Sequence, residues 1–351
     1  MQIPAEASHI TSLAYVHGGE LVRASLKSFT EDFIVEEVLG YEPEGQGEHL
    51  YFWIECRNQN TTFVARHLAK VAGVELKAVT YSGLKDRYAV TRQWFGIHLP
   101  GKAQFEPDQF SAEGIQVLSI NRHSKKLRRG VHRENKFEIR LRDIPAAHIP
   151  SLNHKIVTVF EAGVPNYFGP QRFGHGESNI AQAMQAVQSK RRLNREQRDR
   201  VYSTLRSFLF NEMLSERIQR GDWNRLVEGD FLMLAGRNSF FIMDNLDAEL
   251  ESRLKAKDVI IGGVLPGRGN LPWSSVALSH YDQFREAHSE EIGYIIGKQV
   301  DWLPRPTALY PSISDLNTHE DGFTLCFSLP TGSFATTLLR EVFELDDKST
   351  G

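Results

Sequence analysis

The sequence predicts an α/β fold in which a helix-rich module interrupts a discontinuous first domain. Two observations carry this prediction. Short strand-like segments fill the first part of the chain and return near its end, and long helical segments lie between them. A chain of 351 residues is also long enough for about two domains with separate cores. We therefore place the first domain at 1–160 and 305–351 and the inserted domain at 161–304.

The first domain is predicted to contain a sheet with one buried face. Its strand-like segments carry β-branched and aromatic residues with partial alternation of apolar and polar positions. They are 33–37, 50–56, 78–82, 93–99, 115–120 and 136–144. Between the second and third of them, apolar residues at helical spacing predict a helix that begins at Asn60 or Thr61 and ends at Gly73.

The later part of the chain is predicted to be mainly helical. The helical segments are 149–163, 178–188, 195–220, 246–257 and about 289–298. A glycine-rich connector at 260–270 is expected to break this region. Near the end of the chain a strand at 322–330 precedes a helix at 333–345, and this strand is expected to join the first sheet.

Charge is distributed unevenly along the chain. The composition is that of a soluble globular protein, and a net charge of −3 gives no overall basic field that would attract nucleic acid. Basic residues gather locally instead, with seven Lys or Arg in 121–136 and six in 190–200. Such segregation predicts a surface with one basic side.

The two cysteines, Cys56 and Cys326, lie far apart in strand-like segments and form neither a disulfide framework nor a zinc ligand set. No secretory signal and no apolar run of about 18 residues is evident. These features favour a cytoplasmic protein with no membrane partner, and we expect a monomer.

Several common catalytic motifs are missing from the sequence. It has no phosphate-binding G-x-x-x-x-G-K-[ST], no G-x-G-x-x-G between a strand and a helix, and no G-x-S-x-G nucleophile turn. The 13 histidines form neither H-E-x-x-H nor a Cys/His set typical of zinc. An enzyme with this sequence is therefore expected to work without a metal or an organic cofactor.

The polar turn between the strand-like segments near 79–82 and 93–99 holds Asp86 between two cations, Lys85 and Arg87. An aspartate is ionised at neutral pH in any case. Neighbouring side chains on a strand or turn point away from one another, so a cation from elsewhere in the chain is the expected partner of Asp86. Taken by itself, the segment also fits a solvated charged turn without a function.

Four further residues combine chemistry suited to RNA with an ordinary structural role. Phe33 could stack a base or belong to the core, and Asn135 could read a base edge or cap a turn. Arg172 lies in an aromatic loop that could hold RNA or act as a hinge. Phe334 lies at a helix start, where hydrophobic packing is the simpler explanation.

In their order along the chain, these segments resemble the TruD family of tRNA pseudouridine synthases. The most specific match is G-x-K-D-x-x-A-V-T-x-Q, present as Gly83 to Gln93, and N-Y-F-G-x-Q-R-F-G follows at 166–174. Other matching segments run through nearly the whole length: EDFIVEE, GEHLYFWI, KLRRGVHRENKFEIRLRD and LPTGSFATTLLRE.

The resemblance implies an RNA-modifying enzyme that flips uridine 13 out of tRNA and isomerises it to pseudouridine without a cofactor. Asp86 matches the catalytic aspartate of the family, and Lys27 matches a lysine near it that is the expected partner cation. Contacts with the substrate tRNA are expected from Phe33, Asn135, Phe334 and Arg172.

The resemblance also implies a mixed, mainly antiparallel sheet flanked by helices and interrupted by a helix-rich α+β insertion. An alternative is a non-catalytic RNA-binding or RNA-folding protein on the same scaffold, which would bind tRNA without forming pseudouridine. A metal-dependent nuclease fits less well, because the sequence shows no clustered set of carboxylates.

Overall fold

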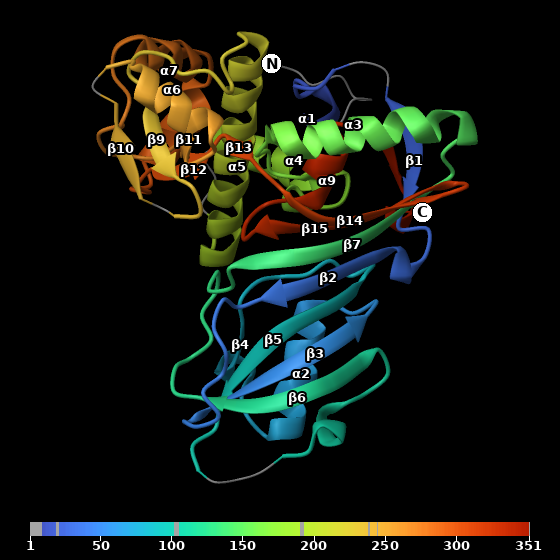
Figure 1. Ribbon diagram of the computed structural model, residues 1–351. Helices are drawn as coiled ribbons and strands as arrows, with labels where there is room; N and C mark the ends of the chain where they lie inside the picture. Colours follow the sequence, from blue (N-terminus) through green and yellow to red (C-terminus); the bar gives the residue numbers. More distant parts are fainter. Residues whose placement is uncertain are drawn as a thin grey trace. The chain divides into compact units, whose positions relative to one another are not determined.

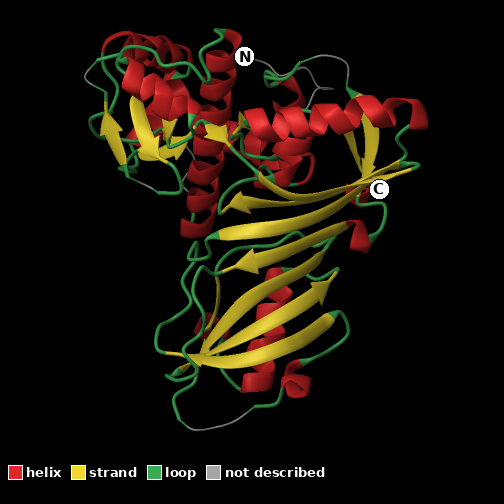
Figure 2. Cartoon of the chain, viewed as in Figure 1, coloured by secondary structure: helices red, strands yellow, loops and turns green. Residues whose placement is uncertain are grey.

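The computed structural model describes residues 9–18, 21–101, 105–189, 193–237, 239–243 and 245–350 (Figures 1 and 2). Its contacts divide the chain into two compact units. The sheet unit comprises 21–160, 311–332 and 342–351, and the helical unit comprises 1–20, 161–310 and 333–341. The domain bounds inferred from the sequence, 1–160 with 305–351 and 161–304, remain a prediction.

Among the described residues of the sheet unit, ten strands form one sheet with the order β14-β15-β7-β2-β5-β3-β6, to which β1, β4 and β16 attach. The strands are β1 (Val22–Leu26), β2 (Phe33–Val38), β3 (His49–Arg57), β4 (Val79–Tyr81), β5 (Val90–His98), β6 (Ile115–His123), β7 (Glu134–Arg142), β14 (Ser312–His319), β15 (Gly322–Pro330) and β16 (Phe343–Asp347). The pairs β1–β16 and β2–β5 are parallel, and the remaining pairs are antiparallel. The predicted mixed, mainly antiparallel sheet is confirmed.

Alternation along β3 builds one core of the sheet unit. Phe52 and Ile54 point to one face, where they pack with Val64 and Leu68 of α2 (Thr61–Ala72). Helix α2 ends at Gly73, whose φ of 65° is the left-handed conformation that favours glycine, so the predicted helix is confirmed.

A second helix, α3 (Ile149–Ala162), confirms another prediction from the sequence. Its residue Phe160 meets the ring of Phe327 in β15 edge-on, with ring centroids 5.4 Å apart. This contact ties the helix to the strand that returns from the end of the chain.

Two predictions about secondary structure are wrong. The helix expected at 333–345 is only α9 (Ala335–Leu339), and the residues after it form β16, which pairs in parallel with β1. The local sequence fits a helix, but pairing with a strand more than 300 positions earlier decides the outcome, an effect that no local pattern reports.

The glycine-rich segment 260–270 is the second correction, because it contains β11 (Val259–Leu265) rather than only a connector. A Cβ built on Gly262 would lie 2.0 Å from the ring of Phe231, and one on Gly263 would lie 2.8 Å from the ring of Phe210. The glycines therefore permit close aromatic packing against a strand instead of breaking it.

The helical unit holds a second sheet and most of the helices. Its sheet has the order β10-β9-β11-β12, and β8 pairs with β13. The elements are α1 (His9–Ser12), β8 (Val164–Pro165), α4 (Ser178–Ser189), α5 (Arg195–Gln219), β9 (Phe231–Leu234), β10 (Phe240–Ile242), α6 (Ala248–Lys255), α7 (Ser275–Ala287), α8 (Ser289–Ile296), β12 (Leu303–Pro306) and β13 (Ala308–Leu309), with β11 and α9 as given above. No helix among the described residues is long and apolar enough to span a membrane.

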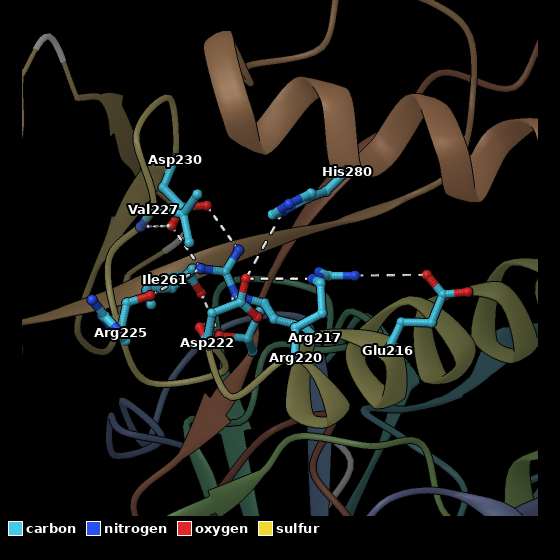
Figure 3. A network of polar contacts seen from close by, with 10 residues as sticks. Glu216, Arg217, Arg220, Asp222, Arg225, Val227, Asp230, Ile261 and His280 are labelled. Carbon is cyan, nitrogen blue, oxygen red and sulfur yellow. Dashed lines mark hydrogen bonds and ion pairs between the residues drawn. The ribbon is translucent and has the colours of Figure 1, made fainter.

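An ion pair is buried near the end of α5 in the helical unit (Figure 3). The guanidinium of Arg217 contacts both carboxylate oxygens of Asp230, at 2.8 and 2.6 Å, and it also donates to the backbone oxygens of Asp222 and Arg225. The side chain of Asp230 is 0% exposed and also accepts a hydrogen bond from the Val227 backbone. Arg217 thus connects the turn that follows α5 with the segment that leads into β9.

Candidate functional site

The loop between β4 and β5 carries the Lys-Asp motif and is held from two sides. The backbone N–H of Lys85 donates to Oγ1 of Thr61 at 3.0 Å, which fixes the loop to the start of α2. The side chain of Gln93 donates to the backbone oxygen of Gly83 at 3.2 Å and accepts a hydrogen bond from Thr61. The loop that presents Asp86 is therefore anchored to a helix and to a strand.

Asp86 contacts the lysine that the family resemblance implies. Lys27 directly follows β1 and donates from Nζ to Oδ2 of Asp86. Its side chain is only 2% exposed, whereas that of Asp86 is 20% exposed, so a buried cation faces a carboxylate that solvent can reach. A second carboxylate lies near the same lysine, since Oδ2 of Asp347 is 3.7 Å from Nζ of Lys27. Low local polarity strengthens the attraction between these charges.

The backbone of Lys27 adopts a φ of 58°, in the left-handed region that non-glycine residues seldom occupy. This conformation costs about 1–2 kcal/mol. Contacts made by the side chain must offset that cost, and outliers of this kind gather at functional sites. The contact of its ammonium group with Asp86 is one interaction that can offset the cost.

Lys85 points away from Asp86 and enters a buried polar cluster, which we define as Glu37, Ser82, Lys85, His132 and Asn135. Its Nζ lies 2.6 Å from Oδ1 of Asn135 and 3.1 Å from Oε2 of Glu37. Burial lowers the pKa of Lys85, and the charge of Glu37 opposes that shift. Asp86 therefore pairs with Lys27 and not with Lys85, its neighbour in the sequence.

The polar cluster sets the orientation of the Asn135 amide. Because Oδ1 accepts from Lys85, Nδ2 faces Nε2 of His132, at 3.4 Å, and donates to it. Burial lowers the pKa of His132, and the charge of Lys85 lowers it further, which keeps this acceptor neutral. One N–H and one lone pair of the amide remain available for another partner.

Phe33 lies beside the same lysine. Nζ of Lys27 is 4.7 Å from the centroid of the Phe33 ring, within the range of a cation–π contact. The ring also meets Phe137 edge-on, and the residue is 4% exposed. The structure thus brings Phe33, Lys27 and Asp86 together, with Asn135 linked to them through the loop.

The other two predicted contact residues belong to the helical unit. Phe334 lies at the start of α9, with its ring centroid 5.9 Å from that of Phe168. The guanidinium of Arg172 lies 5.6 Å from the same ring and bonds to Ser203 and Ser207. Burial lowers the pKa of Arg172. The two residues therefore share an aromatic neighbour within their own unit.

The sequence reasoning missed Glu37 and His132. For Glu37 a signal was present, because it follows Phe33 and Val35 on the same face of a strand and is a carboxylate at the end of an apolar row. No comparable pattern marked His132. Among the described residues, no group of three or more His, Cys, Asp or Glu side chains is arranged to hold a metal ion.

The environment of His132 predicts a pH dependence of stability. Its pKa lies below the ordinary 6.5 in the folded chain, so the unfolded chain takes up a proton first as the pH falls. The unfolding free energy should therefore decrease below about pH 6.5. We expect the melting temperature of the wild type to fall more steeply than that of His132→Gln between about pH 7.5 and 5. Parallel curves for the two proteins would contradict this prediction.

Comparisons with known proteins give matches over nearly the whole chain. The family profile described as tRNA pseudouridine synthase D (TruD) matches residues 10–184 and 179–342. The tRNA pseudouridine synthase D of Methylococcus capsulatus is 41% identical over 342 residues, covering 95% of each chain. That of Pseudomonas aeruginosa is 40% identical over 341 residues, covering 94% of this chain and 93% of its own.

A solved structure from Methanosarcina mazei, assigned as a tRNA pseudouridine synthase D, covers 100% of both chains with a TM-score of 0.71 and 20% identity. At 20% identity, this similarity supports a shared fold and nothing further. The family profile and the relatives above span nearly the whole chain, including the loop of Asp86. This chain belongs to the tRNA pseudouridine synthase D (TruD) family.

Proposed function

We propose that this protein isomerises uridine 13 of tRNA to pseudouridine, with Asp86 as the reacting carboxylate. The activity named for its relatives supports the reaction and the substrate class. The observation that carries the assignment of Asp86 is its contact with the buried ammonium group of Lys27. A carboxylate that a buried cation holds in place, yet that stays open to solvent, can react with a molecule that enters from outside.

The reaction rearranges bonds within one nucleotide. The N1–C1′ bond breaks, the uracil turns, and a C5–C1′ bond forms; C5 then loses its proton and N1 gains one. Asp86 can start this sequence by attacking C1′ and leaving when C5 attacks, or by removing a proton from the ribose to form a glycal. Lys27 has the same task in both routes, which is to hold the carboxylate in place.

The target must leave its stack to reach Asp86, at a cost of a few kcal/mol. Stacking on aromatic rings returns about 1–3 kcal/mol per base. We assign this stacking to Phe33 and recognition of the uracil edge to the free positions of the Asn135 amide. In the helical unit, we assign a contact with an RNA base to Phe334 and a phosphate contact to Arg172. A cytoplasmic location and a monomeric state complete the proposal.

The experiment is to incubate unmodified tRNA transcripts with the protein and to locate pseudouridine by carbodiimide mapping. We expect one new pseudouridine at position 13 and none in a transcript that carries cytidine there. Pseudouridine at another position would overturn the assigned target. Tight binding without any pseudouridine would favour the non-catalytic RNA-binding alternative.

A further inference from the structure

A groove of about 600 Å³ in the sheet unit gathers basic side chains from three separate segments. Arg66 comes from α2, Lys77 from a short 3₁₀ helix (Leu76–Ala78), and Lys126, Arg128 and Arg129 from the segment between β6 and β7. Its lining contains five cations and no carboxylate. Only the last three belong to the basic segment 121–136, so folding brings cations together that lie far apart in the sequence.

The cations of the groove differ in whether a neighbour neutralises them. Lys77 pairs with Glu75 at 2.6 Å, and the guanidinium of Arg129 lies 5.5 Å from the ring centroid of Tyr81. Arg66, Lys126 and Arg128 are exposed and form no ion pair with any residue that the structure describes. Unpaired like charges at one place create a local positive field that a polyanion would neutralise.

The groove adjoins the loop that carries Asp86. Residues of β4, including Tyr81, form part of its wall, and the next residue, Ser82, begins the loop. The backbone N–H of Gly130, directly after the basic residues, donates to the oxygen of Ser82 at 2.6 Å. The side chain of Ser82 in turn bonds to Glu37 of the polar cluster. A chain held in the groove would thus lie along the strand that leads to Asp86.

We infer that this groove binds the phosphodiester backbone of the substrate RNA beside the reacting nucleotide. The cations are exposed and come from separate segments, which suits successive phosphates of a polymer. A site for a single phosphate would instead bring buried donors together at one point. The inference rests on the proposed function for the identity of the polyanion.

The test compares tRNA affinity in two variants of equal charge. Arg66→Gln, Lys126→Gln and Arg128→Gln together remove the unpaired cations of the groove. Arg237→Gln, Lys255→Gln and Lys298→Gln form the matched control, since all three residues are exposed and lie in the helical unit. Dissociation constants for an unmodified tRNA transcript are measured by fluorescence anisotropy at several concentrations of KCl.

We expect the groove variant to bind about 10- to 30-fold more weakly at about 50 mM salt, with the slope of log K against log salt reduced by about 2 to 3. The control should keep the wild-type affinity and slope. A charge-preserving variant, Arg66→Lys, Lys126→Arg and Arg128→Lys, should do the same. At saturating enzyme, the single-turnover rate of the groove variant should stay within a few-fold of wild type.

Three results would overturn the inference. The first is an unchanged slope of log K against log salt in the groove variant, and the second is an equal loss of tRNA affinity in the control. The third is tight binding of uridine monophosphate that the groove variant abolishes, because this would indicate a mononucleotide site. Binding is measured without catalysis, so failure of the proposed function is seen separately. If the wild-type chain binds tRNA but forms no pseudouridine, the proposed isomerase activity is refuted. The salt dependence of tRNA binding then still tests whether the groove binds RNA.

Discussion

Asp86→Asn should lower the rate of pseudouridine formation by on the order of 10⁴-fold or more, as loss of a reacting group does in other enzymes. The amide has nearly the same shape and can still accept a hydrogen bond from Lys27, so the loop should keep its position. It can neither attack C1′ nor accept a proton. The rate is measured in single turnover on a tRNA transcript, and tRNA affinity should stay within a few-fold of wild type.

Asp321→Asn is the matched control for that experiment. Asp321 is an exposed carboxylate, and it is paired with Arg140, whose side chain is only 13% exposed. Its replacement makes the same change of charge and shape within the sheet unit, and it should leave the rate within a few-fold of wild type. Substantial activity in Asp86→Asn, or an equal loss in Asp321→Asn, would refute the role given to Asp86.

Arg217→Met should lower the free energy of unfolding by about 3–5 kcal/mol, because it leaves the carboxylate of Asp230 buried without its cation. The backbone oxygens of Asp222 and Arg225 lose their donor as well. Urea unfolding followed by circular dichroism measures the change. This effect is expected to be larger than that of breaking an exposed ion pair, which is worth about 0–1 kcal/mol.

The double variant Arg217→Met with Asp230→Asn tests the cause of that loss. It removes the isolated buried charge, while the Asn side chain can still accept a hydrogen bond from the Val227 backbone. We therefore expect the double variant to recover part of the stability lost in Arg217→Met. A double variant that is less stable than the single one would show that lost packing, and not the unpaired charge, destabilises the protein.

The sequence predicts structure best where local periodicity and tertiary packing agree. Helix α2 has apolar residues at helical spacing and a glycine at its end, and it folds as expected. At the end of the chain the two disagree, because residues 343–345 fit a helix but pair with β1. At Gly262 the rule that glycine breaks structure fails, since the ring of Phe231 fills the space that a side chain would need.

The candidate site divides in a similar way. The motif from Gly83 to Gln93 and the resemblance pointed to Asp86 and Lys27, and the structure places these two side chains in contact. The polar cluster could not be read from local composition. It forms because β2 and β7 pair in a register that sets Glu37 opposite Asn135. A slip of one residue would turn either side chain to the other face of the sheet.

By itself, the sequence determined the fold class, most of the longer helices and the family, because these depend on periodicity and on motifs that are contiguous in the chain; it did not mark α7. Only the tertiary structure decided which cation meets Asp86. Lys85 is its neighbour in sequence, but the side chain of Lys85 leaves the loop toward Glu37, and Lys27 comes from 59 positions earlier. Electrostatic partners are set by distance in space, and the pairing of strands sets that distance.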